Sequence, residues 1–88
     1  MNPTAIAAVV PRKRTRLVGR VTSVSAQVRP WVWFDAIVED GTGTITLRFT
    51  GRRTVPGITP GRRVSAEGTP DRVGEFLFIL NPHHEFGI

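Results

Sequence analysis

Residues 31–49 read WVWFDAIVEDGTGTITLRF, two runs of alternating apolar and polar side chains joined by the tetrapeptide DGTG at 40–43. Successive side chains of a β-strand point to opposite faces, so an alternating run predicts a strand with one buried face. Strands are therefore expected at residues 31–39 and 44–49. The glycines between them accept the positive φ that a tight turn needs, which predicts an antiparallel hairpin.

The alternation within the two runs indicates which side chains face the core and which face solvent. The face expected to be core carries Val32, Phe34, Ala36 and Val38 from the first run and Ile45, Leu47 and Phe49 from the second. The opposite face carries Trp31, Trp33, Asp35 and Ile37, followed by Thr44, Thr46 and Arg48. The hairpin is thus expected to bury one aliphatic face and to present two tryptophans and an arginine on the other.

Further strands are expected on both sides of this hairpin. Residues 16–25 (RLVGRVTSVS) alternate and then slip out of phase, which predicts a β-bulge near residues 22–23. Residues 63–69 alternate as well. Residues 75–80 (EFLFIL) predict a last strand that is apolar at both parities, so the pattern leaves its core face open.

Glycine and proline delimit these strands. Residues 51–61 (GRRTVPGITPG) predict an irregular connector whose Val55 and Ile58 plug one end of the fold. Residues 70–74 predict a turn, and the Asn-Pro pair at 81–82 is expected to end the last strand.

Nine glycines and seven prolines spread along 88 residues leave little or no room for helix. Residues 1–13 are expected to form a flexible or partly helical N-terminal arm, and residues 14–88 a single all-β domain. Five short strands in an open sheet would leave long edges, and closing the sheet on itself removes them. We therefore predict a five-stranded Greek-key barrel, the OB fold, with an SH3-like barrel as the main alternative.

The charge distribution points to an anionic partner. Lysine and arginine number 12 against 7 acidic residues, a formal net charge of +5. The first 34 residues contain no acid and carry the basic residues Arg12, Lys13, Arg14, Arg16, Arg20 and Arg29. One region of the molecule is thus expected to be positively charged, which suits a polyanion. The chain has no cysteine and no apolar run near the roughly 20 residues of a membrane helix, so we expect a cytoplasmic protein without membrane contact.

In order along the chain, several turn and strand motifs resemble bacterial OB-fold nucleic-acid-binding domains. These motifs are VGRV at 18–21, DGTG at 40–43, Phe49, PGITPG at 56–61, Gly68 and Asn-Pro at 81–82. The chain is similar to short stand-alone OB-fold proteins of high-GC bacteria and to the wedge-type OB domain of the RecG helicase. It departs from them at His83-His84, where relatives carry an aromatic residue. The resemblance implies the OB fold and binding of nucleic acid.

The strongest candidate binding residues are Trp31 and Trp33 with Arg29 and Arg48. On an OB fold, oligonucleotides lie across strands two and three. Bases stack on exposed aromatic rings and arginines hold phosphates. The alternative is that one tryptophan caps the core or that the pair packs against the N-terminal segment.

Other arginines are candidates for phosphate contacts. Arg52 and Arg53 flank the connector, where planar guanidinium groups suit phosphate; ordinary solvated charge is the alternative. Arg20 and the run Arg12, Lys13 and Arg14 belong to the basic N-terminal third. This run is expected to add affinity without sequence preference or, equally, to be a solvated tail.

Catalysis and metal binding have little support in the sequence. His83 and His84 are adjacent, so on an extended chain they point to opposite sides and make a poor chelate. No catalytic motif, cofactor, metal or small-molecule substrate is indicated. The sequence therefore predicts a non-catalytic module that binds single-stranded DNA or RNA with low sequence specificity. The alternative is a protein-interaction module, in which the tryptophan patch binds a partner or a second copy.

Overall fold

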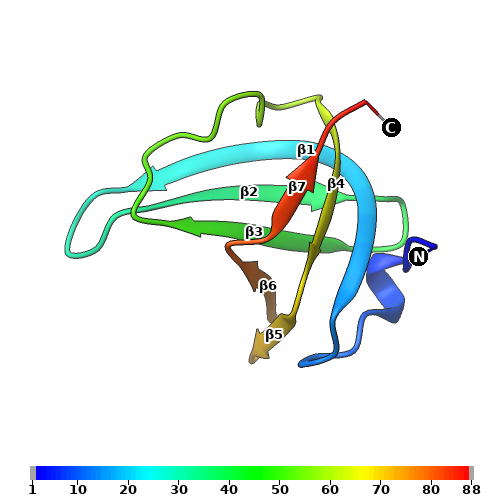
Figure 1. The fold of residues 1–88 in the computed structure, drawn as a ribbon. Helices are drawn as coiled ribbons and strands as arrows, with labels where there is room; N and C mark the ends of the chain where they lie inside the picture. Colours follow the sequence, from blue (N-terminus) through cyan, green and yellow to red (C-terminus); the bar gives the residue numbers. More distant parts are fainter. Residues whose placement is uncertain (1, 88) are drawn as a thin grey trace.

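Seven β-strands in one sheet make up most of the computed structural model, which describes residues 2–87 (Figure 1). The elements are a 3-10 helix η1 (Ile6–Ala8) and the strands β1 (Thr15–Gln27), β2 (Trp33–Glu39), β3 (Thr44–Thr50), β4 (Arg63–Gly68), β5 (Pro70–Val73), β6 (Phe76–Leu80) and β7 (His83–Glu85). The strand order is β5-β6-β3-β2-β1-β4-β7, with β3 and β6 parallel and the other neighbours antiparallel. Within the described residues, no helix is long and apolar enough to cross a membrane.

The strand count differs from the five that the sequence predicts. The expected turn at 70–74 is the strand β5, which pairs with β6, and the short strand β7 follows the Asn-Pro pair. Pro70 fits the first position of an edge strand because it has no N–H to donate. β4 and β5 are separated by Thr69 alone, so the chain bends there from one part of the sheet to the other. The hydrogen-bonded sheet ends at β5 and β7 and is not closed into the expected barrel.

The central hairpin forms, but its first strand begins at Trp33 and not at residue 31, so Trp31 and Val32 belong to the preceding loop. β2 and β3 pair in register from Trp33 opposite Thr50 to Glu39 opposite Thr44. Within β2 and β3 the expected core parity is confirmed, since the inward side chains from Phe34 to Phe49 are at most 5% exposed. Val32, which was also expected in the core, is only half-buried because it precedes β2. The core consists of Ile6, Val9, Leu17, Val21, Phe34, Ala36, Val38, Ile45, Leu47, Phe49, Val55, Ile58, Val64, Ala66 and Ile79. Val55 and Ile58 of the connector are among them, which confirms that they plug the fold.

β1 is long because it bends across two partners. Its first half pairs with β4 and its second half with β2, and Figure 1 shows the resulting curve. The expected bulge is confirmed, since the register shifts between Val21 and Ser23. Just before it, Gly19 lies against β2 so closely that a Cβ there would be 2.6 Å from the carbonyl oxygen of Glu39. Glycine is therefore needed where β1 bends over the hairpin.

The N-terminal segment packs against the turn between β2 and β3. Its helix η1 places Ile6 in the core, 2% exposed. The main-chain N–H of Ile6 donates to Oδ2 of Asp40 at 2.9 Å, and the N–H of Ala7 donates to Oγ1 of Thr42 at 3.1 Å. Partial burial raises the pKa of Asp40, but hydrogen bonds from Thr42 and from the Ile6 N–H outweigh it and hold the pKa below its ordinary 3.8.

The ionised carboxylate of Asp40 makes the stability of the fold depend on pH. A carboxyl group whose pKa is lower in the folded state contributes stability above its unfolded pKa and loses it as the pH falls through the folded pKa. We expect the melting temperature of Asp40→Asn to fall less steeply than that of the wild type between about pH 5 and pH 2. Thermal melts monitored by circular dichroism across this range check it. Parallel curves for the two proteins would contradict the role assigned to Asp40.

Candidate nucleic-acid interface

The outward sides of β2, β3 and β6 form one continuous surface. Two rows of paired residues cross it, Ser23–Ile37–Thr46–Phe78 and Ser25–Asp35–Arg48–Leu80. Trp33 lies beside the second row and Phe76 precedes Phe78 by two residues on the same side of β6. We call Trp33, Asp35, Arg48, Phe76 and Phe78 the aromatic face.

Two rings of the aromatic face stack on each other, and the Arg48 guanidinium lies over the third. Phe76 and Phe78 have centroids 5.1 Å apart and planes inclined by 21°. The Arg48 guanidinium carbon lies 4.1 Å from the centroid of Trp33 and 5.3 Å from that of Phe76. A π-surface therefore runs from β2 across β3 to β6, and it is partly open because Phe76 is 39% exposed.

Arg48 is held in place by Asp35. Its Nε donates to Oδ1 at 2.9 Å and its Nη2 donates to Oδ2 at 2.8 Å, a planar bidentate pair. Hydrogen bonding to Asp35 raises the pKa of Arg48 above its already high value, so the guanidinium stays charged. Because the carboxylate balances that charge, the centre of the aromatic face is electrically neutral. Arg48, predicted to hold phosphate, is positioned here as part of the stacking surface.

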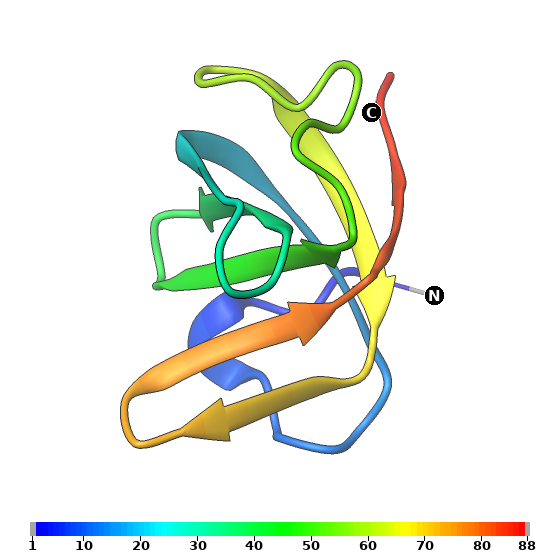
Figure 2. The ribbon, with the colours of Figure 1, turned by 90° about the vertical axis from the view of Figure 1, so that its left-hand side faces the viewer.

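The loop between β1 and β2 borders one end of this face. It carries Arg29 and Trp31, whose side chain is 70% exposed. The N–H of Gly51 donates to the carbonyl of Val32 at 2.7 Å, which brings the connector beside the loop. Arg52 and Arg53 follow directly and are exposed. Figure 2 shows this loop in front, with the β5–β6 hairpin below it.

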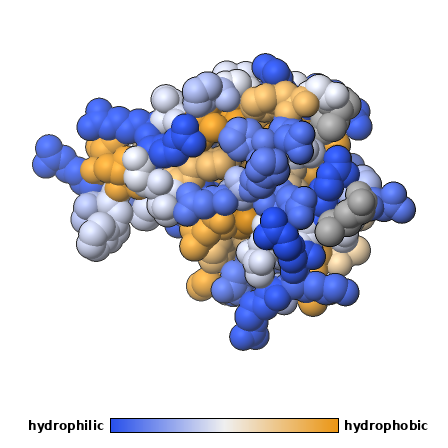
Figure 3. Space-filling model, in the orientation of Figure 1, coloured by the Kyte–Doolittle hydropathy of each residue, from blue (hydrophilic) through white to orange (hydrophobic). Residues whose placement is uncertain are grey.

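This end of the molecule is both basic and apolar. In Figure 3, hydrophilic side chains project at the left-hand end, where Figure 1 places the β1–β2 loop, and apolar surface is visible among them. None of the ion pairs found among residues 2–87 involves Arg29, Arg52 or Arg53. The sequence-predicted residues Trp31, Arg29, Arg52 and Arg53 therefore gather at one border of the aromatic face. Trp33 and Arg48 lie within it.

The other predicted basic residues lie elsewhere. The N–H of Arg12 donates to the carbonyl of Pro70 at 2.7 Å, which places Arg12 and Lys13 near β5. Arg14 pairs with Glu67 of β4 at 3.1 Å through a largely exposed side chain. Arg12, Lys13 and Arg14 therefore lie away from the two tryptophans.

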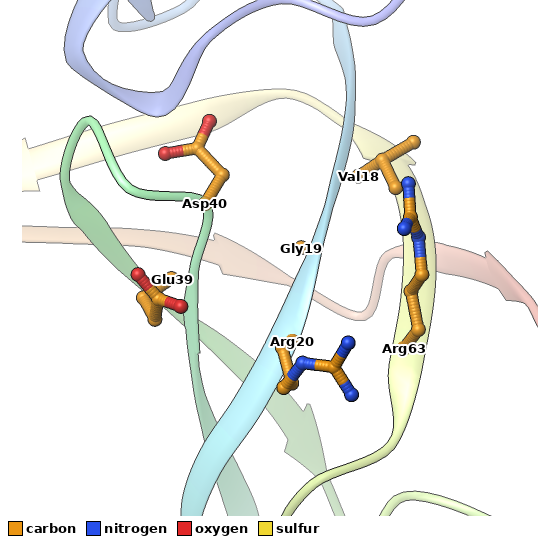
Figure 4. A pocket seen from close by; sticks show the side chains of 6 residues that line it. All are labelled: Val18, Gly19, Arg20, Glu39, Asp40 and Arg63. Carbon is orange, nitrogen blue, oxygen red and sulfur yellow. The ribbon is translucent and has the colours of Figure 1, made fainter.

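Arg20 lines a shallow hollow on the β1–β4 side of the fold (Figure 4). The lining residues are Val18, Gly19, Arg20, Glu39, Asp40 and Arg63. Arg20 and Arg63 lie on one side of β1 and the two carboxylates on the other. Nη1 of Arg20 donates to the carbonyl of Gly61 at 2.7 Å, so this arginine anchors the connector to β1. Two arginines and two carboxylates line the hollow, so their charges cancel and the hollow has no preference for an anion.

Of the two adjacent histidines, His84 packs against aromatic rings and His83 is exposed. The ring of His84 meets Phe49 and Phe86 edge-on, at centroid distances of 5.5 and 5.6 Å. Burial and the nearby charges of His83 and Arg52 lower the pKa of His84, so it is neutral at pH 7. No group of three or more histidine and acidic side chains suited to a metal ion occurs within residues 2–87.

Sequence reasoning missed Phe76 and Phe78 as members of the site. The signal was present, because residues 75–80 are apolar at both parities. A strand apolar on both sides buries both sides or uses one for binding. Here Ile79 is fully buried, whereas Phe76 and Phe78 face outward.

The strand order, with the bent β1 shared between β2 and β4, is that of an OB-like fold. Among solved structures, the chain is similar to one chain of a replication protein A heterotrimer bound to ssDNA, with a TM-score of 0.69. The two chains are 24% identical over an alignment that covers 85% of this chain and 57% of the other. This protein thus spans little more than half the length of that chain. At this identity, the similarity shows the fold.

No protein-family model and no curated protein matches the chain. The resemblance to stand-alone bacterial OB-fold proteins and to the RecG wedge domain therefore stays a prediction.

Proposed function

We propose that the chain is a non-catalytic module that binds single-stranded DNA or RNA with little dependence on the overall sequence. The observation that carries this proposal is the aromatic face, a neutral surface of rings bordered by arginines that form no ion pair within residues 2–87. Such a combination suits single strands because every base has a π-face and every nucleotide has a phosphate. In a duplex, the base faces are stacked on one another and cannot reach the rings.

The two kinds of contact are divided between the centre and the border. Bases stack on the open ring surface of Trp33, Phe76 and Phe78. The phosphates then lie toward Arg29, Arg52 and Arg53 at the β1–β2 loop. Because the Asp35–Arg48 pair is neutral, stacking supplies the affinity at the centre, and the ionic contribution comes from the border.

The structural neighbour supports the same class of ligand, since that protein is a replication protein A heterotrimer bound to ssDNA. We interpret β4 and β5 as one bent strand, which makes the sheet a variant of the five-stranded OB barrel. On that interpretation, the face across β2 and β3 is the surface where OB folds bind oligonucleotides.

Chemical-shift mapping of labelled protein with oligothymidine tests the location of the site. The proposal predicts perturbed amides along β2, β3 and β6 and in the β1–β2 loop, and unperturbed amides along β4 and around the hollow beside Arg20. Perturbations confined to β4 and the hollow beside Arg20 would contradict it.

A separate prediction concerns how the arginines beside the β1–β2 loop make single-strand binding depend on salt. We expect the double variant Arg52→Gln/Arg53→Gln to reduce the log–log salt slope of single-strand binding by about 1.4, roughly 0.7 for each phosphate that is no longer neutralised. Dissociation constants at several salt concentrations measure the slope. The control is Arg12→Gln/Lys13→Gln, which removes the same charge from the N-terminal arm. An unchanged slope in the first variant together with a reduced slope in the control would place the phosphate path on the arm.

A second candidate function is supported by the apolar exposure of the same face. Ile37, Phe76 and Leu80 are 39%, 39% and 51% exposed, and exposed aromatic residues with arginine are typical of protein interfaces. Light scattering with and without oligonucleotide distinguishes the two functions. A stable dimer that does not bind oligonucleotide would favour protein interaction through this face.

A further inference from the structure

The Asp35–Arg48 pair is the most enclosed ion pair among the described residues. The Asp35 and Arg48 side chains are 15% and 24% exposed, whereas both other pairs contain a side chain at least 59% exposed. Withdrawing two charges from water is costly, and such a pair often contributes little net stability. Its place between Trp33 and Phe76 puts these polar atoms at the edge of any base that stacks there.

The pair retains hydrogen-bonding capacity. An ionised carboxylate has about four acceptor positions, and Asp35 accepts one hydrogen bond from Arg48 on each oxygen. Arg48 donates one hydrogen from Nε and one from Nη2, which leaves the second hydrogen of Nη2 and both hydrogens of Nη1 without a partner among residues 2–87. The pair therefore offers carboxylate acceptors beside a guanidinium donor, on two side chains that are partly exposed.

One base complements that pattern. The Watson–Crick edge of guanine presents two adjacent donors, N1–H and the N2 amino group, next to the O6 acceptor. Adenine and cytosine each present a single donor group on this edge, and thymine or uracil presents one N–H between two carbonyls. Single-stranded bases are read on these edges when their faces are stacked on aromatic side chains.

We propose that Asp35 and Arg48 select guanine at one position of the bound single strand. This inference rests on the proposed function and adds a base preference to it. N1–H and the N2 amino group donate to the free acceptor position of Asp35 Oδ2, and O6 accepts the second hydrogen of Arg48 Nη2, the guanidinium nitrogen beside that oxygen. A bidentate base contact gives about tenfold or more discrimination.

The same pair also positions Arg48 over Trp33, and the two roles predict different results. If Asp35 acts only by positioning, its loss weakens binding of every oligonucleotide by the same factor. If it reads the base, its loss changes the ratio between oligonucleotides. Asp35→Asn is the suitable variant because the amide keeps the shape and one acceptor but removes the second acceptor and the charge.

The experiment measures fluorescence anisotropy for oligothymidine and for the same oligonucleotide with one central guanine, inosine or adenine. A matched oligouridine pair with and without guanine shows whether the preference extends to RNA. A single guanine avoids self-association, and inosine lacks only the N2 amino group. Glu75→Gln, which removes one negative charge from the exposed β5–β6 turn, is the control for charge.

We expect the wild type and Glu75→Gln to bind the guanine oligonucleotide about tenfold more tightly than oligothymidine, with inosine and adenine losing most of that gain. Asp35→Asn should bind the guanine oligonucleotide and oligothymidine with nearly equal affinity, so that the ratio between them falls to about one. Equal binding of all oligonucleotides by the wild type would overturn the base preference and leave the proposed function intact. Equal weakening of all of them in Asp35→Asn would overturn the reading role. Absence of any binding would overturn both proposals.

Discussion

Replacing Trp33 by alanine lowers the affinity for oligothymidine by about tenfold to a hundredfold, because stacking on one aromatic side chain contributes about 1–3 kcal/mol per base. Trp33 is the ring of the aromatic face that Arg48 contacts most closely, at 4.1 Å. Its loss removes a base platform and also one side of the surface that holds the guanidinium. Anisotropy titrations of Trp33→Ala and the wild type measure the change.

The fold should tolerate this substitution. Trp33 lies on the outward side of β2, and the core side chains beneath the sheet do not depend on it. We expect the melting temperature to fall by roughly 5 °C or less, which corresponds to about 1 kcal/mol for a domain of this size. Trp31→Ala is the comparison, since Trp31 is 70% exposed in the bordering loop and its loss should weaken binding less. Unchanged affinity in Trp33→Ala would show that bases do not stack on the aromatic face.

The substitution Gly19→Ala destabilises the fold by about 3 kcal/mol, at the upper end of what added volume in a packed core usually costs. The new Cβ would lie 2.5 Å from Cγ1 of Val38 and 2.6 Å from the carbonyl oxygen of Glu39. The second atom belongs to the backbone of the central hairpin, so rotating a side chain does not relieve the contact. Thermal melts should show a fall of roughly 15 °C.

Gly43→Ala is the matched control for Gly19→Ala. A Cβ at Gly43 would lie 3.3 Å from Cγ2 of Ile6 and farther from every other atom, so a shift of a few tenths of an ångström relieves the contact. We expect this variant to melt within a few degrees of the wild type. Similar melting temperatures for Gly19→Ala and the wild type would mean that β1 does not need to approach β2 so closely.

The sequence predicted the elements whose signals are local. Strict alternation in residues 31–39 and 44–49 assigned the core faces of β2 and β3, and the phase slip in β1 located the bulge at Val21 and Ser23. The glycines at 40–43 were sufficient to predict the turn. The apolar residues of the connector were sufficient to predict their own burial. In each case, the deciding interaction involves residues close together in the chain or a single buried face.

The features that sequence reasoning missed depend on distant neighbours. Residues 75–80 are apolar on both sides, and only the parallel pairing of β6 with β3 shows that Ile79 is inside and Phe78 outside. Pro70 favours a turn in isolation but begins β5 because that strand lies at the edge of the sheet. Arg48 pairs with Asp35 because the two residues lie directly opposite each other on adjacent strands. Alternation alone places both on the outward face, but the charge of the arginine is balanced only in this register.

Binding of single-stranded nucleic acid to the aromatic face can be measured by fluorescence anisotropy. Labelled single-stranded DNA, matched duplex and single-stranded RNA are each titrated at two salt concentrations. We expect saturable binding of a single strand that is weaker for the duplex and falls as salt increases. Absence of binding to every probe at the lower salt concentration, despite a net charge of +5, would contradict the proposed function and favour a protein partner at the same face.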